Sequence, residues 1–307
     1  MKTESVLEKV LSAGHVAVTG ECGPPRGAQP EKVKEKAELL RGYVDVVNVT
    51  DNQTAMVRMS SFAAGLLLKQ IGLEPVLQMV TRDRNRLAAQ SEIIGAYAHG
   101  INTMLCLSGD HPKFGDHPMA ANVYDLDSVQ LIKTVRGMRD DGKFQGGADI
   151  ANPPKMFIGA AANPFADPFE LRVARLAKKV RAGVDFIQTQ CIYNIDKFEK
   201  WMAGVRERGL HKEVYIMAGV TPMKSVGMAR YMKNKVPGMD VPDKVIDRMA
   251  GVPKEKQAQE GVDICVESIQ RLLGIEGVAG IHIMAIEWEK IVPEIVERAG
   301  LYPRPEV

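Results

Sequence analysis

The sequence has little of what marks a secreted, membrane or nucleic-acid-binding protein. It has only four cysteines in 307 residues, and none forms a CxxC pair, which argues against a disulfide framework. No apolar run approaches the roughly 18 residues that span a bilayer, and the N-terminal segment lacks the pattern of a signal peptide. The 40 basic and 38 acidic residues are scattered along the chain. We therefore expect a cytoplasmic protein with reduced thiols and with no nucleic-acid or membrane partner.

Short apolar runs alternate with helical patterns along the whole chain. Most of these runs contain β-branched residues, as do strands that are buried on both faces of a parallel sheet. They lie at 15–20, 44–49, 74–80, 102–108, 155–161, 184–190, 213–219 and 280–285. Eight such strands predict a (β/α)8 TIM barrel, a single domain over residues 1–307. A doubly wound open sheet is the alternative, but no GxGxxG follows the first strand.

The segments between the strands contain helical patterns and two insertions. The helical segments are 30–42, 54–72, 167–183 and 288–300, with Asp167 expected as the N-cap of the third. A loop rich in Pro, His, Asp and Gly interrupts the rhythm at 109–125, and a second insertion with three prolines occupies 234–260. We expect both to be loop insertions within the single barrel domain.

Polar residues follow several of the strands, at the end of the barrel where active sites lie. Glu21 comes after the first strand and before a rigid Gly-Pro-Pro turn. A carboxylate in this position is a candidate general acid with a raised pKa, although a surface ion pair with Arg26 is the alternative. Asp110 follows the fourth strand, where it has either a functional role or the commoner role of capping a turn.

Two further patterns raise the question of a metal. Three cysteines fall at predicted strand ends, Cys22, Cys106 and Cys191, and zinc accepts such ligands, but buried cysteine is commonly a small hydrophobic residue. The doubled GDHP sequence at 109–112 and 115–118 brings two Asp-His pairs together, but in a loop rich in proline they are poorly preorganised as ligands. We predict no metal site.

The order of the motifs resembles the methylenetetrahydrofolate reductase family. Glu21-Cys22-Gly23-Pro24-Pro25-Arg26 is similar to the family's Glu-Phe-Phe-Pro-Pro-Arg after strand one, and the resemblance covers roughly residues 10–303. It implies a flavin-dependent (β/α)8 barrel that reduces 5,10-methylenetetrahydrofolate to 5-methyltetrahydrofolate. Hydride would come from N5 of the reduced flavin, and Glu21 would be the general acid at N10 of the folate.

The same resemblance implies the other site residues. Asp110 and Gln190 correspond to family residues at the pterin and flavin, so with Glu21 they are expected in catalysis and substrate binding. The expected flavin contacts are Thr50, Gln78, Ser108, Gly109, Asp110, Gly159, Ala160 and Lys179. Of these, Gln78 replaces a family His, and Ser108 replaces a family Arg.

The sequence also departs from the family pattern. The strand-eight Tyr and Arg that hold the adenosine end of FAD correspond to Met284 and Trp288, and a helical Asp and Asn correspond to Arg172 and Arg175. The cofactor is therefore expected to be FAD or FMN.

The C-terminal stretch resembles the anaerobic, heteromeric branch of the family, in which an iron–sulfur and zinc partner subunit can accompany the flavoprotein. The expected electron donor is NAD(P)H, ferredoxin or such a partner subunit, and self-association is a further expectation. The alternatives are a folate-binding methyltransferase that uses zinc thiolate or a corrinoid, and a folate-binding subunit without redox activity.

Overall fold

The computed structural model describes residues 1–236 and 238–307, so position 237 of the predicted insertion 234–260 lies outside the described residues. Eight parallel strands close into a barrel in chain order, with β8 paired to β1. The strands are β1 (Ala17–Cys22), β2 (Val46–Val49), β3 (Pro75–Val80), β4 (Thr103–Leu107), β5 (Phe157–Ala162), β6 (Phe186–Cys191), β7 (Tyr215–Val220) and β8 (Val278–Ile283). The predicted (β/α)8 barrel is confirmed, and each predicted strand range overlaps an observed strand.

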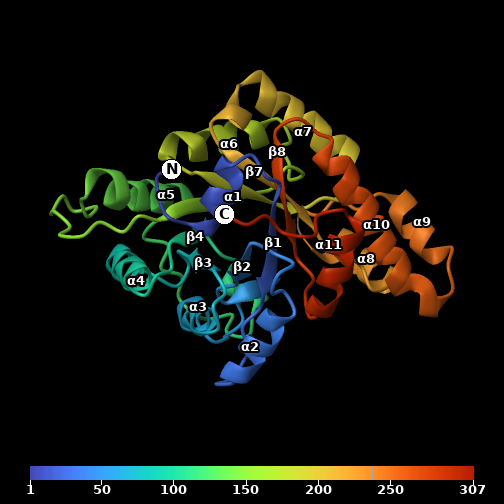
Figure 1. The fold of residues 1–307 in the computed structure, drawn as a ribbon, viewed down its shortest axis with the longest axis horizontal. Coiled ribbons are helices and arrows are strands. Elements are labelled where there is room, and N and C mark those ends of the chain that lie inside the picture. Colours follow the sequence, from blue (N-terminus) through green and yellow to red (C-terminus); the bar gives the residue numbers. More distant parts are fainter. Residues whose placement is uncertain (237) are drawn as a thin grey trace.

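Helices surround the barrel, as Figure 1 shows. They are α1 (Val6–Ser12), α2 (Pro30–Glu38), α3 (Ser61–Gln70), α4 (Arg86–Ala98), α5 (Ser128–Arg136), α6 (Leu171–Ala182), α7 (Ile195–Glu207), α8 (Val226–Lys235), α9 (Asp243–Ala250), α10 (Gln257–Leu273) and α11 (Val292–Arg298). Most of these helices pack their apolar faces on the outward-facing strand residues in the larger core cluster, whereas α1 belongs to a second apolar cluster and α8 and α9 to a third. No helix of the described residues is both long enough and apolar enough to cross a membrane.

Four predicted helices have different starts or ends. The prediction that Asp167 caps its helix is wrong, because α6 begins at Leu171 and its N-cap position is Glu170. The helix expected at 54–72 begins only at Ser61, where Ser60 accepts a hydrogen bond from the Ala63 amide, and a turn of 3-10 helix precedes it. The other two, expected at 30–42 and 288–300, form only α2 and α11, each of which has a proline in its first turn.

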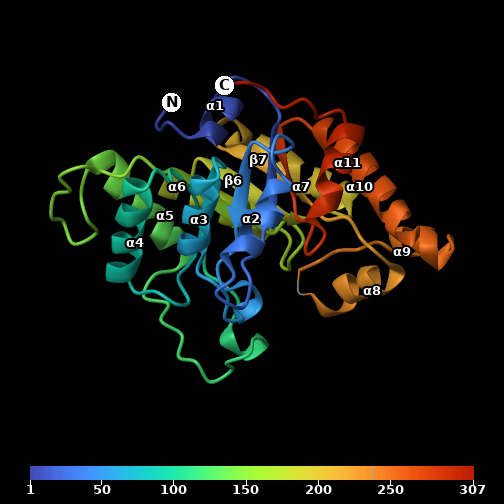
Figure 2. The same ribbon diagram turned by 60° about the horizontal axis from the view of Figure 1, so that its bottom comes forward.

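A second apolar cluster closes the N-terminal end of the barrel. Leu7, Val10 and Leu11 of α1 pack against inward-facing strand residues, and among these the rings of Phe157 and Phe186 stack with centroids 5.1 Å apart. Figure 2 shows α1 and both chain termini at this end, and the loop after β4 projecting from the opposite end. The N-terminal end is therefore filled, and the open end is the one where the strands finish.

Candidate active site

A cavity of about 440 Å³ opens at the C-terminal ends of the strands. Residues from β1, β3, β4, β5, β6, β8 and from helices α5 and α6 line it. The polar side chains of its wall are Glu21, Gln78, Ser108, Ser128, Asn163, Arg172, Arg175, Lys179, Gln188, Thr189, Gln190 and His282. A cavity of this size at this end of a barrel has the usual position of an active site.

Glu21 lies near the end of β1 with its side chain 11 % exposed. Burial, and then the nearby carboxylate of Glu289, raise its pKa from 4.5 to about 7. The alternative of a surface ion pair with Arg26 is wrong, because Arg26 pairs with Asp116. Glu21 is therefore a carboxylic acid that keeps its proton to near neutral pH, which is the property required of a general acid.

Gln190 enters the cavity through an irregularity in β6. The pairing of β6 with β7 shifts register between Gln188 and Cys191, and such bulges redirect side chains next to active sites. Gly219 of β7 permits this arrangement, since a Cβ there would lie 2.2 Å from the Thr189 carbonyl oxygen. The Gly219 amide donates to Thr189 Oγ1 at 2.9 Å, which holds the two strands together beside the bulge.

The wall of the cavity that α6 forms is basic. Arg172, Arg175 and Lys179 lie three and four residues apart on α6, so they share one face of that helix and line the cavity. Among the described residues none of the three pairs with a carboxylate: Arg172 donates to main-chain oxygens, and Lys179 Nζ donates to the Ala161 carbonyl. Burial and the neighbouring Arg175 lower the pKa of Lys179 to about 8. This wall offers positive charge to an anionic ligand.

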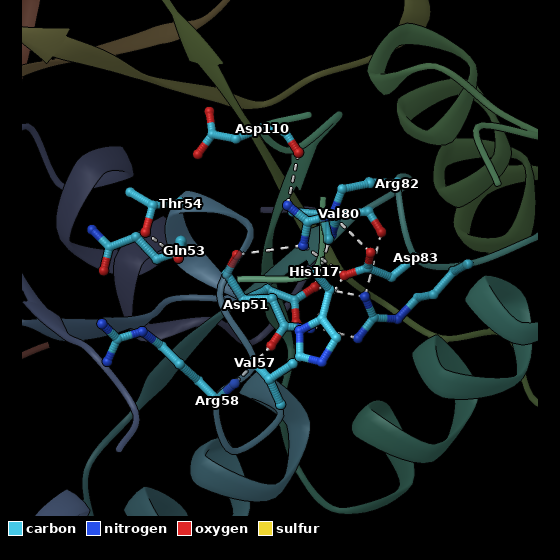
Figure 3. A network of polar contacts seen from close by, with 12 residues as sticks. Asp51, Gln53, Thr54, Val57, Arg58, Val80, Arg82, Asp83, Asp110 and His117 are labelled. Atoms are coloured by element: carbon cyan, nitrogen blue, oxygen red, sulfur yellow. Dashed lines mark hydrogen bonds and ion pairs between the residues drawn. The ribbon is translucent and has the colours of Figure 1, made fainter. Parts of the chain in front are cut away.

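Asp110 lies in the exposed loop after β4. Its main-chain oxygen accepts a hydrogen bond from Arg82 Nη1 at 2.9 Å, while its carboxylate points away from that arginine (Figure 3). Arg82 also binds Asp83 through two nitrogens, each at 2.7 Å. The network therefore fixes the backbone at Asp110 and leaves the side chain free of its contacts; Asp110 does not line the cavity.

The other predicted contacts divide between the cavity and its surroundings. Gln78, Ser108 and Lys179 line it, whereas Thr50, Gly109, Gly159 and Ala160 do not. Thr50 is buried, and within the described part of the chain its Oγ1 has no hydrogen-bond partner. Gly109 has φ +84°, which favours glycine. A Cβ at Gly159 would lie 2.2 Å from the Phe186 ring, so this glycine serves the packing below the cavity.

The four cysteines are packed in the interior, and Asp116 of the second GDHP copy holds its loop in place. All four cysteines are free and buried, and burial raises the pKa of the Cys22 and Cys191 thiols to about 12. Asp116 binds Arg26, the Val57 amide and His117 in the loop. Within residues 1–236 and 238–307, no group of three or more His, Cys, Asp and Glu side chains could hold a metal ion.

Sequence reasoning missed the polar floor of this cavity. His282 is buried in β8, with Nε2 3.9 Å from Glu21 Oε2, and burial lowers its pKa to about 4. Asn48 of β2 and Gln188 of β6 are also buried and bind each other across the barrel. The signal in the sequence was a polar residue inside an apolar strand, because a buried polar group needs a partner.

Comparisons with known proteins point to one family. The family model described as methylenetetrahydrofolate reductase matches residues 6–300. A Caenorhabditis elegans protein named probable methylenetetrahydrofolate reductase (NADPH) is 23% identical over 96% of this chain and 44% of its own length. An Arabidopsis thaliana protein named methylenetetrahydrofolate reductase (NADH) 1 is 22% identical over 100% of this chain and 52% of its own. The chain thus spans about half the length of these curated relatives.

A solved structure has the same fold. It is an uncharacterized protein from Clostridium thermocellum that binds two copies of 5-methyl-5,6,7,8-tetrahydrofolic acid, with TM-score 0.64 and 14% identity over 95% of this chain and 97% of that one. At this identity the likeness concerns the fold alone. The family match over nearly the whole length decides the assignment: this chain belongs to the methylenetetrahydrofolate reductase family.

Proposed function

We propose that the protein reduces 5,10-methylenetetrahydrofolate to 5-methyltetrahydrofolate, with Glu21 as the general acid. The observation that carries this proposal is a buried carboxyl group with a pKa of about 7 at the floor of the barrel cavity. Protonation at N10 of the folate opens its five-membered ring and leaves an electrophilic carbon on N5. Glu21 gives its proton to N10, and hydride addition to that carbon completes the methyl group.

The same cavity would hold a flavin, which in its reduced form would supply the hydride. Arg172, Arg175 and Lys179 would hold its phosphate, since guanidinium groups and a lysine without carboxylate partners suit a phosphate monoester or a pyrophosphate. Thr50 Oγ1 lies outside the cavity lining and has no partner among the described residues, so it would make a hydrogen bond to the flavin only if the ring reached past the present cavity wall. FMN and FAD both carry such a phosphate group and the flavin ring, so these residues would suit either cofactor.

Gln190 and Asp110 complete the proposed site. The Gln190 amide both donates and accepts hydrogen bonds, which suits the polar edges of a pterin and of an isoalloxazine. Asp110, whose backbone Arg82 fixes just after β4, would orient the substrate. Gln78, Ser108 and Gly109 would contact the flavin from β3 and the β4 loop, and the β5 backbone at Gly159 and Ala160 would approach it.

The electron donor is part of the proposal. NAD(P)H fits the names of the relatives from Caenorhabditis elegans and Arabidopsis thaliana, and it could stack in the cavity where the folate stacks. Reduced ferredoxin or an iron–sulfur and zinc partner subunit is the second candidate. Anaerobic mixing of the flavin-loaded protein with NADH, NADPH or reduced ferredoxin, followed by the flavin absorbance, separates these donors.

The test begins with an absorption spectrum of the purified protein. We expect a yellow protein with a band near about 450 nm from oxidised flavin, and acid release then identifies FMN or FAD. Formation of 5-methyltetrahydrofolate from the methylene substrate and reduced flavin would establish the reaction. A colourless protein with stoichiometric zinc would instead support the methyltransferase, and a colourless protein that only binds folate would support a subunit without redox activity.

A further inference from the structure

A chain of hydrogen bonds crosses the barrel below Glu21. The amides of Asn48 and Gln188 bind each other reciprocally, with Asn48 Nδ2 2.7 Å from Gln188 Oε1 and Gln188 Nε2 3.0 Å from Asn48 Oδ1. Gln188 Nε2 also lies 3.0 Å from Thr19 Oγ1, and Thr19 Oγ1 lies 2.8 Å from His282 Nδ1. All four residues are at most 3 % exposed, so the chain has little access to water.

The donors along this chain determine where the His282 ring carries its proton. An amide nitrogen has two hydrogens, and Gln188 Nε2 gives one to Asn48 and the other to Thr19. Thr19 Oγ1 accepts from Gln188 and so has its own hydrogen left to donate to His282 Nδ1, 2.8 Å away; this is the arrangement that we assign to the pair. With Nδ1 as an acceptor, the neutral ring has its proton on Nε2. Burial keeps the ring neutral, since the pKa of His282 is about 4.

Strand register directs that N–H toward Glu21. Thr19 pairs with His282 between β1 and β8, and Glu21 lies two residues after Thr19, on the same face of its strand. His282 Nε2 is 3.9 Å from Glu21 Oε2, so a movement of about 1 Å would make a hydrogen bond.

The other titratable groups around Glu21 act differently. Glu289 raises the pKa of Glu21 and lies 3.4 Å from Lys36 Nζ of α2, which offsets part of its charge. Burial raises the pKa of the Cys22 and Cys191 thiols to about 12, so both thiols are neutral near pH 7. Lys179 lies on the basic wall of the same cavity. His282 is thus the neutral N–H donor that faces this carboxyl group.

We propose that His282 is a positioning residue for the acid Glu21, and that the Asn48–Gln188–Thr19 chain sets this role by fixing the ring proton on Nε2. An N–H beside the carboxyl group cannot accept the Glu21 proton, so that proton stays available to a substrate in the cavity. The same N–H stabilises the carboxylate that remains after the proton has left. The inference deepens the proposed function and rests on it for the identity of the acid's substrate.

The tautomer is measured directly by NMR of protein labelled with ¹⁵N-histidine. The chain has six histidines, and His282→Gln identifies the signal of His282 by its loss. We expect a protonated Nε2 and an unprotonated Nδ1 at neutral pH. Thr19→Val keeps the side-chain shape but removes the donor to Nδ1, so the Nδ1–H tautomer should gain population. A wild-type ring with its proton on Nδ1 would overturn the proposal.

The effect on Glu21 is measured as its carboxyl pKa, from ¹³C chemical shifts of labelled protein without substrate, with Glu21→Gln to assign the signal. His282→Phe should raise that pKa by about 1 unit because the N–H donor is gone, and His282→Gln should restore most of the difference. An unchanged pKa in His282→Phe would refute the positioning role. Circular dichroism checks folding, and Thr19→Val supplies a second variant if His282→Phe does not fold.

The pH profile of folate reduction separates this inference from the proposed function. If Glu21 is the acid, the limb of the rate profile that reports it moves with its carboxyl pKa in His282→Phe. If the carboxyl pKa moves and the rate profile does not, the positioning role stands and the acid assignment fails. If neither moves, the positioning role fails and the acid assignment is judged from Glu21→Gln.

Discussion

Replacing Glu21 by Gln should make the protein more stable at alkaline than at acid pH, relative to wild type. The carboxyl group has a pKa of about 7 in the fold and 4.5 when exposed, so the native state holds a proton that the unfolded chain has already released. Wild-type stability therefore falls as pH rises between these values, and the neutral amide removes this loss. From about pH 5 to about pH 8 the difference grows by about 2.5 kcal/mol, or about 4 °C in Tm for a chain of this length.

The assay is thermal unfolding of both proteins, followed by circular dichroism at several pH values across that range. The difference in Tm between variant and wild type is the informative quantity, since effects of the substitution that do not depend on pH cancel from its slope. Glu35→Gln, at an exposed position on α2, is the matched control and should give a difference that does not change with pH. A flat difference for Glu21→Gln as well would refute the raised pKa.

Four further predictions concern the cavity and the strands around it. Glu21→Gln should keep bound flavin and its reduction but lose folate reduction by about two to four orders of magnitude, measured by single-turnover kinetics; normal folate turnover would exclude Glu21 as the acid. Lys179→Ala should lower flavin retention, whereas Arg181→Ala, on the same helix but outside the cavity, should not. Because the pKa of Lys179 is about 8, wild-type flavin affinity should fall as pH rises through that value, and titration of apoprotein with flavin at several pH values tests this. Gly219→Val should destabilise the protein by about 2–4 kcal/mol in denaturant unfolding, because its Cβ would collide with the Thr189 carbonyl; wild-type stability would show that the β6 bulge tolerates a side chain.

The barrel could be predicted because its strands are buried on both faces and therefore appear as eight apolar runs of similar spacing. The ends of the helices could not be predicted as well, because they depend on hydrogen bonds between side chains and the main chain that the residue types alone do not determine. Asp167 has the side chain of an N-cap, but the chain from Asp167 to Glu170 forms a turn in which Arg172 binds the main-chain oxygens of Asp167 and Pro168. The helix begins after that turn, at Leu171. The N-cap preference of Asp167 is therefore outweighed by the turn that Arg172 stabilises from the first turn of the helix.

Part of the candidate site could be predicted from the barrel topology, and part depends on contacts between distant strands. Glu21 and Gln190 stand at strand ends, so the barrel topology alone places them at the open end. Asn48 and Gln188 are 140 residues apart, and their pairing follows only once the barrel closes and its register is known. The two copies of GDHP look equivalent in sequence but differ in the structure. Arg82 binds the main-chain oxygen of Asp110, whereas the carboxylate of Asp116 binds Arg26 and His117.

Burial changes the protonation of the acid at one end of the cavity and of the lysine at the other. At the floor, burial raises the pKa of Glu21 to about 7, so that much of it still carries its proton near neutral pH, and lowers the pKa of His282 to about 4; the acid therefore faces an N–H donor instead of a competing base. At the basic wall, burial lowers the pKa of Lys179, yet at about 8 it leaves most of the ammonium charged at neutral pH. A bound phosphate would favour the charged form further. One desolvated cavity therefore holds a neutral acid at one end and cations at the other, which are the two conditions that an acid-assisted reduction with an anionic cofactor requires.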